Sequence, residues 1–191
     1  MKKRAFTIVE ISILAVILLI VACLVIPFSI DDTKQASRVL EWRALQDRIS
    51  YAFSMATVYE ETGAQKIEDY IMKSISDDAY QKIVPYKIRY MNGSSASGIG
   101  SFDNVYTVGE DNVIGFKWSK KPDEANGLMF YDINGRKGPN RWGKDVFGVK
   151  ILDGKVTPLC ANKSHQEIKE DCSKEGTGCC CSYYYLIGGN F

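Results

Sequence analysis

The fold is decided at the beginning of the chain, where residues 2–28 read KKRAFTIVEISILAVILLIVACLVIPF. Between Ile11 and Phe28 the only polar side chain is Ser12, so this segment is apolar enough, and as a helix long enough, to cross most of a bilayer. One charge interrupts the pattern. The carboxylate of Glu10 costs about 2.5 to 3.5 kcal/mol if it lies at mid-membrane, and an ionisable group in such a place usually has a functional partner.

Three interpretations of this segment compete. A cleaved secretory signal is typical of a shorter apolar run that ends in small residues, whereas this run ends in Val25–Phe28. A plain uncleaved anchor would keep the basic residues 2–4 on the cytoplasmic side, with Glu10 reaching back toward the headgroups. The third interpretation is a short basic leader that ends in a small residue and is followed by Phe6–Glu10 at the start of a long apolar helix.

The segment from Lys2 to about Pro27 resembles the prepilin-like family, which comprises type IV pilins and the pseudopilins of type II secretion. On that resemblance Ala5 is the last leader residue, where the family usually has Gly, and Phe6 is the new N-terminus. Glu10 matches the family's acidic residue, and Pro27 matches the helix-kinking proline of many type IV pilins. The resemblance implies cleavage between Ala5 and Phe6 by a prepilin peptidase, methylation of the Phe6 amine, and assembly with other pilin or pseudopilin subunits on an inner-membrane platform.

The chemistry of Glu10 agrees with this resemblance. A free amine at Phe6 of one subunit and the carboxylate of Glu10 in a neighbour are each costly in lipid, and pairing them lowers the cost of both. A repeated axial shift between identical helices would repeat the pair along a filament. Pro27 removes one intrahelical hydrogen bond, so we expect either a kink or loosened turn there or simply the end of the membrane segment.

The apolar pattern changes beyond Phe28. Apolar residues then recur at spacings of three and four, which is typical of one face of an amphipathic helix; they are Val39, Trp42, Leu45, Ile49, Ala52, Phe53, Ala56 and Tyr59. Because residues 29–37 contain no Gly or Pro, the sequence favours one continuous helix from Phe6 to about Glu61, about 80 Å long and ended by Gly63. The alternative is an anchor joined by a linker to a separate domain.

The length and the charge of the chain limit the number of domains and the kinds of partner that the rest of the sequence can have. The 191 residues divide into a leader at 1–5, a transmembrane and assembly helix at 6–28, and one extracytoplasmic domain at 29–191. Loss of the three basic residues of the leader reduces 24 basic residues to 21 against 23 acidic residues, a net charge of −2. Lys and Arg do not cluster along the sequence as a phosphate-tracking surface requires, so no nucleic-acid partner is predicted.

The domain is predicted to combine helix and sheet. A second helix is expected over Ile67–Ile75, and residues 92–101 are typical of an exposed loop. Short β-branched and aromatic runs then follow; they are Val105–Val108, Val113–Trp118, Leu128–Ile133, Val146–Leu152 and Val156–Leu159. Because short connections favour antiparallel pairing, the sequence predicts an α+β fold in which the outer half of a long helix packs on a small antiparallel sheet. The pilin resemblance implies the same fold.

One loop, residues 132–145, reads DINGRKGPNRWGKD. Oxygen ligands on a Gly-bent loop are what Ca²⁺ requires, and Asp132, Asn134 and Asp145 would converge if the loop folds back. The other interpretation is a turn in which these side chains bond backbone amides, because four cations stand beside the two carboxylates: Arg136, Lys137, Arg141 and Lys144. Similar loops in pilin-like proteins favour a family role without indicating a ligand.

The cysteines indicate an oxidising, extracytoplasmic location. Cys23 lies in the anchor, whereas the other five crowd into a tail that begins near residue 160: Cys160, Cys172, Cys179, Cys180 and Cys181. This clustering predicts two disulfides and one leftover thiol, in a pairing that the sequence leaves open. Zinc is the alternative, although His165 is the only His and no Cys-x₂-Cys pair is present. The aromatic run Tyr183–Ile187 predicts a final strand that covers the sheet.

No catalytic constellation is recognisable. The chain has one His, no Gly-x-Ser-x-Gly and no zinc-protease or phosphate-binding motif, so no enzymatic activity is predicted. The favoured hypothesis is a structural subunit, of a specialised minor kind, of a type IV pilus or type II secretion pseudopilus, held by a single span in the cytoplasmic membrane before assembly. An uncleaved, singly anchored extracytoplasmic binding protein is the alternative, and an anchored enzyme with a carboxylate pair is a third hypothesis.

Overall fold

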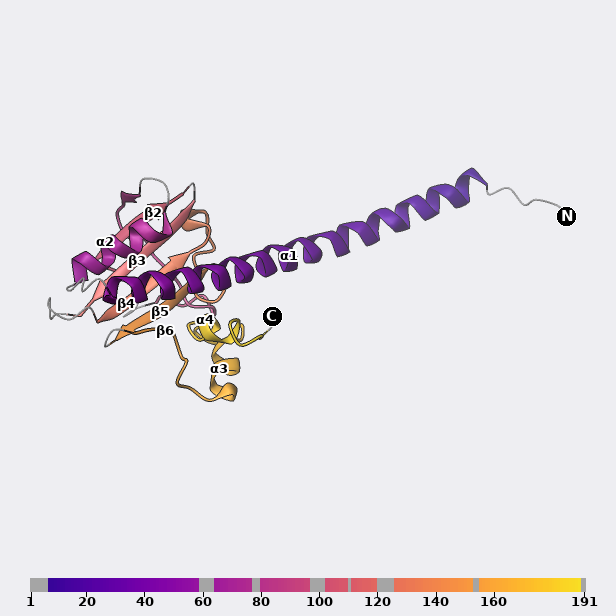
Figure 1. The fold of residues 1–191 in the computed structure, drawn as a ribbon. Coiled ribbons are helices and arrows are strands. Elements are labelled where there is room, and N and C mark those ends of the chain that lie inside the picture. Colours follow the sequence, from indigo (N-terminus) through magenta and orange to yellow (C-terminus); the bar gives the residue numbers. More distant parts are fainter. Residues whose placement is uncertain are drawn as a thin grey trace. The chain divides into compact units, whose positions relative to one another are not determined.

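The computed structural model describes residues 7–58, 64–76, 80–96, 102–109, 111–119, 126–152 and 155–189, with the side chains at 26–31, 57–58 and 64–65 left aside. Contacts divide the chain into two units, residues 1–37 and 38–191. Helix α1, Ile8–Val58, begins in the first unit and ends in the second (Figure 1). The predicted cleavage residues Ala5 and Phe6 and the predicted helix end at Gly63 lie outside the described residues.

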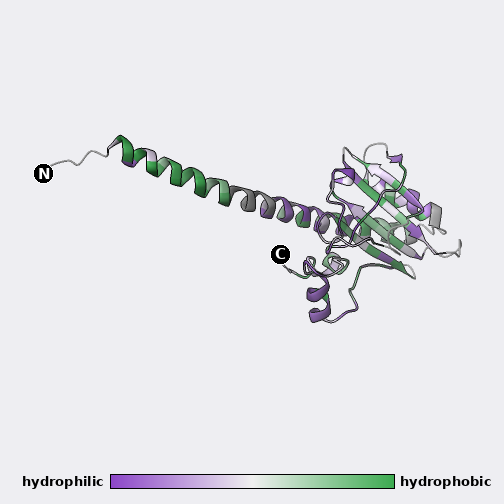
Figure 2. Cartoon of the chain, turned by 180° about the vertical axis from the view of Figure 1, so that it is seen from behind, coloured by the Kyte–Doolittle hydropathy of each residue, from purple (hydrophilic) through white to green (hydrophobic). Residues whose placement is uncertain are grey.

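The first unit is an apolar stretch of helix. Ile8–Val25 has no buried side chain, and it is the one helix in the described part of the chain that is long and apolar enough to cross a membrane (Figure 2). The backbone stays helical at Pro27, so this proline does not end α1. The interpretation of Pro27 as the end of the membrane segment stays a prediction, because a continuous helix can leave the membrane at this residue.

The second unit is built on an antiparallel sheet of six strands in the order β1-β2-β3-β4-β5-β6. The strands are β1 Gln81–Lys82, β2 Asn104–Val108, β3 Asn112–Trp118, β4 Gly127–Asp132, β5 Val146–Leu152 and β6 Lys155–Pro158. Their order along the chain is their order in the sheet, as expected when short turns join antiparallel neighbours. The predicted α+β class is confirmed, and five strands lie within one residue of their predicted bounds. Sequence reasoning missed β1, since two residues carry no alternation.

Helices α1 and α2 cover one face of the sheet (Figure 1). The predicted apolar stripe of α1 is buried there from Val39 to Ala56 with the apolar face of α2, Ala64–Ile75, and Tyr59 lies outside the described residues. Trp42 of α1 stacks on Phe147 of β5, with ring centroids 5.3 Å apart. Each large side chain buried in this way stabilises the domain by about 1.5 to 3 kcal/mol, so the amphipathic pattern of α1 is explained by its own domain.

A buried carboxylate ties α2 to the sheet. Glu68 is fully buried and accepts hydrogen bonds from Asn104 Nδ2 at 3.1 Å, from Trp118 Nε1 at 2.7 Å and from the Tyr106 hydroxyl. A charge without such donors would be costly to bury, so the three donors on β2 and β3 fix the position of α2. No local sequence pattern marks Glu68 as buried, because its donors are remote along the chain.

The opposite face of the sheet is covered by the chain between β1 and β2. Ile88, Ala96 and Phe102 from this segment form a second buried cluster with side chains of the strands and the following loop: Val105, Val113, Phe130, Trp142, Val146 and Cys179. The sheet is therefore buried on both faces, with helices on one side only. Residues 97–101 of the predicted loop lie outside the described residues.

The tail contains helix α3, His165–Asp171, and the short helix α4, Cys181–Tyr184. The prediction of a final strand at Tyr183–Ile187 is wrong, because helical bonds run from the N–H groups of Tyr184 and Tyr185 to the carbonyls of Cys180 and Cys181. Tyr185 is buried against Phe147, and its carbonyl accepts two hydrogen bonds from the Arg43 guanidinium. The aromatic residues thus fill the end of the core as a helical turn.

Candidate functional site

The first turn of α1 is closed by a reciprocal capping box. Glu10 Oε2 accepts hydrogen bonds from the Thr7 backbone N at 2.8 Å and from Thr7 Oγ1 at 3.0 Å, and the Glu10 backbone N donates to Thr7 Oγ1 at 3.3 Å. Such a box satisfies N–H groups that have no partner inside the helix, and a negative charge is favourable at the positive end of the helix dipole. Thr-x-x-Glu at residues 7–10 signals the box in the sequence, but sequence reasoning missed it.

The capping box gives the Glu10 carboxylate a partner within its own chain. Within a single chain, Thr7 already partners the carboxylate and lowers its cost in lipid. The predicted partner, the amine of Phe6 in a neighbouring subunit, lies outside the described residues, and that pairing stays a prediction. Because Thr7 and Glu10 are both exposed in the chain, their hydrogen bonds can be exchanged for others without opening a core.

The rest of the apolar span offers no polar contact to a partner. Its one hydroxyl, on Ser12, donates to the Ile8 carbonyl oxygen at 2.8 Å. The large apolar side chains around it are exposed, from 49% for Val21 to 84% for Ile8. A surface of this kind can pack only in lipid or against other apolar helices.

The loop between β4 and β5 folds back, as expected, and buries both of its carboxylates. Asp132 Oδ2 accepts a hydrogen bond from the Tyr86 hydroxyl at 2.6 Å, and Asp132 Oδ1 accepts one from the Asn134 backbone N at 3.3 Å. Asp145 accepts from the backbone N of Asn140 at 2.8 Å and of Arg141 at 2.7 Å. All four carboxylate oxygens therefore accept hydrogen bonds from the chain itself.

Burial controls the protonation of this loop. It raises the pKa of Asp132 to about 7; the Tyr86 hydroxyl opposes this shift and the negative charge of Asp145 adds to it. Burial also raises the pKa of Asp145, against the backbone N–H groups of Arg141 and Asn140. Burial and the charge of Asp132 raise the pKa of Tyr86, so its hydroxyl keeps the proton that it donates. The positive charge of Arg38 also opposes the rise of the Asp145 pKa.

These contacts favour the turn interpretation over calcium. A calcium ion at Asp132, Asn134 and Asp145 would have to displace backbone N–H groups and the Tyr86 hydroxyl from the carboxylates. Two amide oxygens of the loop favour a cation, because Asn134 Oδ1 and Asn140 Oδ1 are buried and have no hydrogen-bond partner among the described residues. Lys137, whose ammonium pairs with Asp111, and Arg136, which donates to the Val84 carbonyl at 2.9 Å, contact residues outside the loop.

The tail contains two disulfides, Cys160–Cys180 and Cys172–Cys181, and a leftover thiol at Cys179. The structure thereby selects one of the pairings that the sequence left open. Burial raises the pKa of Cys179 to about 11, so this thiol is protonated at neutral pH and unreactive. The bridge Cys172–Cys181 joins the end of α3 to α4, and the bridge Cys160–Cys180 joins the turn after β6 to the start of α4.

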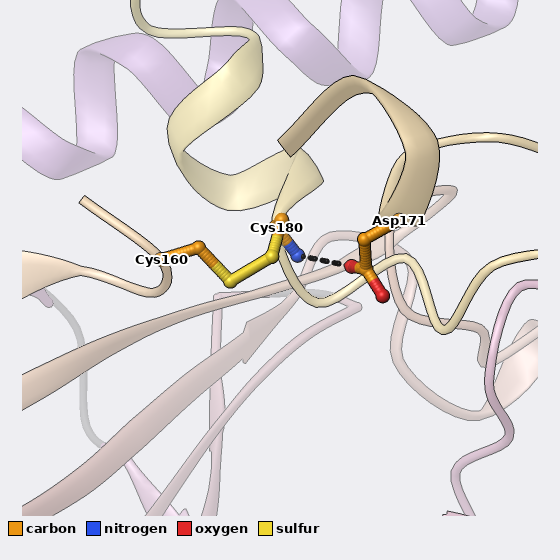
Figure 3. Close-up of side chains that lie close together, drawn as sticks. All are labelled: Cys160, Asp171 and Cys180. Carbon is orange, nitrogen blue, oxygen red and sulfur yellow. Dashed lines mark hydrogen bonds between the residues drawn. A yellow bond between two sulfur atoms is a disulfide. The ribbon is translucent and has the colours of Figure 1, made fainter. Parts of the chain in front are cut away.

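Asp171 organises the tail beside one bridge (Figure 3). Its Oδ2 accepts a hydrogen bond from the Cys180 backbone N at 2.8 Å, and its Oδ1 accepts one from the Thr177 backbone N at 3.1 Å. Cys160, Asp171 and Cys180 bring potential ligand atoms within 4.8 Å of one another. Metals bind thiolates, however, and both sulfurs are consumed by the disulfide, so the oxidised tail offers no zinc site at these residues. Sequence reasoning missed Asp171.

The comparisons with known proteins found no relative. No family model, no curated protein and no solved structure matches the chain. Function is therefore argued from the residues of this chain.

Proposed function

We propose that this protein is a structural subunit, of the minor kind, of a type IV pilus or a type II secretion pseudopilus, and that it polymerises through the apolar start of α1. The observation that carries the proposal is a carboxylate, Glu10, in the first turn of an exposed apolar helix, Ile8–Val25. An anchor alone needs no charge there, and an intramembrane carboxylate by default has a functional partner.

The partner in the filament is the amine of Phe6 in a neighbouring subunit. Before assembly, Glu10 is partnered by Thr7 of its own chain. On assembly, the carboxylate exchanges these neutral donors for a cation, and pairing two opposite charges lowers the cost of both groups in lipid. The same step, repeated from subunit to subunit, extends the filament, because a head-to-tail contact does not close on itself.

Processing supplies that amine. While residues 1–5 remain attached, the Phe6 nitrogen is a peptide amide without charge and cannot neutralise Glu10. A prepilin peptidase that cleaves between Ala5 and Phe6 would create the amine and methylate it. The subunit would wait in the cytoplasmic membrane, with its disulfide-bonded domain outside, until the assembly platform extracts it.

The capping box favours one other candidate. Because Thr7 partners Glu10 within one chain, an uncleaved anchor tolerates the carboxylate without a neighbour. In that case the protein is a singly anchored extracytoplasmic binding protein. The two candidates differ in what Glu10 is for: assembly in the first, and only the closure of a helix end in the second.

Replacement of Glu10 with Ala in the full chain separates the two candidates. We expect the sheared filament fraction, quantified by immunoblot, to fall by about tenfold or more, because about 1.4 kcal/mol of pairing is worth a factor of ten. The membrane-bound amount and both disulfides should stay unchanged. Ser12→Ala is the matched control, since Ser12 is bonded within its own helix. Unchanged filament yield in E10A would refute assembly through Glu10.

A further inference from the structure

A pocket lies in the second unit between α1, the end of α2 and the strands β2 to β4. It has a volume of about 380 Å³, which is within the range of sites that hold small ligands. The apolar side chains of Leu45, Ile75 and Val108 line it from buried positions. Ala44 and Arg48 line it from exposed positions on α1, so the pocket can be reached from solvent.

Glu41 brings a carboxylate to this pocket that is only partly satisfied. Its Oε1 accepts hydrogen bonds from Asn112 Nδ2 at 3.2 Å and from the Tyr131 hydroxyl at 3.1 Å. Within the described part of the chain, no hydrogen bond reaches the other oxygen, Oε2. Burial raises the pKa of Glu41, and the hydrogen bonds from Tyr131 and Asn112 oppose this rise. A half-buried carboxylate of this kind would gain from a positively charged partner.

Arg48 brings the opposite charge to the same pocket. It follows Glu41 by seven positions in α1, which is about two helical turns on the same face and about 10 Å along the axis. Ion pairs within a helix form at spacings of three and four, so these two residues do not neutralise each other. The guanidinium of Arg48 has no hydrogen bond or ion pair among the residues that the structure describes. It therefore remains available to an anion.

These groups together fit one class of ligand. The free oxygen of Glu41 suits an ammonium group, and the planar guanidinium of Arg48 suits a carboxylate. The buried apolar lining between them suits an aliphatic body. Because about 10 Å of helix separates the two charged residues, the two charges of the ligand should be several bonds apart. A short aliphatic peptide with free termini meets these requirements, whereas a free amino acid carries both charges on one carbon.

We propose that this pocket binds a short aliphatic peptide in its zwitterionic form, with the N-terminal ammonium at Glu41 and the C-terminal carboxylate at Arg48. The domain would then recognise a small ligand in addition to any role in a filament. The inference goes beyond the proposed function and rests on neither processing nor assembly, because every residue that lines the pocket belongs to the second unit.

Amide NMR of the full chain in detergent micelles, titrated with the dipeptide dileucine, tests this inference. We expect saturable shifts at the amides of Leu45, Arg48 and Val108, with a dissociation constant of about 1 mM or tighter. N-acetyl-dileucine lacks the ammonium and dileucine amide lacks the carboxylate, so each should bind about tenfold more weakly. The absence of saturable shifts at these amides would overturn the inference. Equal affinity for the three peptides would overturn the recognition of a zwitterion.

Two variants assign the two charges. Glu41→Gln keeps an acceptor oxygen for its two donors and should weaken dileucine binding about tenfold, with little effect on N-acetyl-dileucine. Arg48→Gln should weaken dileucine binding to a similar degree, with little effect on dileucine amide. Asp47→Asn and Lys73→Gln remove the same charges from exposed positions outside the pocket lining and should leave the affinity unchanged. An equal loss in the variants and their controls would overturn the site.

Ala44→Phe tests the pocket with both charges in place. Ala44 is exposed and lines the pocket, so a ring at this position should fill part of the space without altering the core. We expect dileucine binding to be lost while urea denaturation of the domain is unchanged. Unchanged binding would overturn the site, and this variant decides the question if Glu41→Gln does not fold.

Glu10→Ala separates this inference from the proposed function. Because Glu10 lies in the first unit, the variant should bind dileucine as tightly as the unaltered chain even if filament assembly is lost. The two proposals can therefore fail independently. Loss of dileucine binding in Glu10→Ala would overturn the assignment of the ligand to the domain pocket.

Discussion

The two units of the chain partner their carboxylates in different ways. In the domain, Glu68 accepts hydrogen bonds from residues 36, 38 and 50 positions away, and Asp132 accepts one from Tyr86, 46 positions away. In the apolar span, Glu10 accepts hydrogen bonds from Thr7, three positions away in the same exposed turn. The buried carboxylates of Glu68 and Asp132 cannot change partners unless the core opens, whereas Glu10 can, as can Glu167 in the exposed capping box of α3. The same chemical group is thus fixed where it is buried in the domain and exchangeable in the exposed first turn of α1.

Replacement of Glu68 should lower the stability of the domain more than any other change proposed here. Glu68→Ala leaves the donors of Asn104, Tyr106 and Trp118 buried without an acceptor, and unsatisfied buried donors cost about 1 to 3 kcal/mol each. We expect a loss of about 4 kcal/mol in the free energy of unfolding, measured by urea denaturation of the full chain in detergent. Glu68→Gln keeps one acceptor oxygen and should lose less. An equal loss in both variants would contradict this account of α2.

Opening one bridge in the tail should have the next largest effect. Replacement of Cys160 and Cys180 by Ser frees a loop with a sequence separation of 20, for which chain entropy gives about 3 kcal/mol. We expect the same urea assay to show that loss, together with faster exchange of the amides at Ser182 and Tyr185. Cys179→Ser is the control, since the Cys179 thiol forms no disulfide. A loss as large in the control would show that packing, rather than the bridge, stabilises the tail.

Asp132 should make the stability of the domain depend on pH. Its pKa is raised from 3.8 to about 7, so its contribution to stability is complete below about pH 4 and is lost as the pH rises through about 7. Relative to Asp132→Asn, the unaltered chain should gain about 2 kcal/mol between pH 7 and pH 5, since each pKa unit is worth about 1.4 kcal/mol. Asp47→Asn, at an exposed position of α1, is the matched control for the loss of one carboxylate. A profile that Asp132→Asn does not alter would show that this carboxylate is ionised in the folded domain at pH 5.

Thr7→Val tests the exchangeable hydrogen bonds of Glu10 in the apolar span. It removes the hydroxyl of the capping box, and the loss of a cap costs about 1 kcal/mol. We expect several-fold faster exchange of the amides of residues 8–11 in micelles, with no change in the urea denaturation of the domain. Thr7→Ser keeps the hydroxyl and serves as the control. Exchange that is equally slow in Thr7→Val would mean that Glu10 is held by another group.

Calcium should have the smallest effect. Because the oxygens of Asp132 and Asp145 accept hydrogen bonds from the chain, added Ca²⁺ should release no heat in calorimetry and leave the melting temperature of the unaltered chain unchanged. A rise in melting temperature that is absent in Asp145→Asn would establish the metal interpretation instead, with Asn134 Oδ1 as the natural third ligand.

Most of the fold was accessible to sequence reasoning because its signals are local. The 3.6-residue stripe of α1 and the β-branched runs of β2 to β6 record which side chains face the core, and each run is bounded by turn residues. Strand propensity failed at Tyr183–Ile187. There, Cys180 and Cys181 are cross-linked to Cys160 and Cys172, and the backbone forms helical bonds within the tail. Local propensity carries no information about these remote links.

The candidate sites were accessible only in part. The loop at 132–145 and the five tail cysteines were visible as residue types, but the hydroxyl of Tyr86 reaches the loop from 46 positions away. Asp171 lies within the tail, and no spacing motif marks its hydrogen bond to the Cys180 backbone N. Thr7 could have been found, since its spacing from Glu10 is that of a capping box. The pairing of Arg89 with the loop at 132–145 could not, because it is made by backbone groups that are remote along the chain.

The central claim is that the N-terminal segment is processed so that a cation at Phe6 can replace Thr7 as the partner of Glu10. Intact-mass and peptide mass spectrometry of the chain purified from its own membranes tests this claim most directly. We predict a chain that begins at Phe6 and carries a single methyl group on its N-terminal nitrogen. A chain that retains residues 1–5 would contradict the claim and would leave the protein as an uncleaved, anchored extracytoplasmic domain.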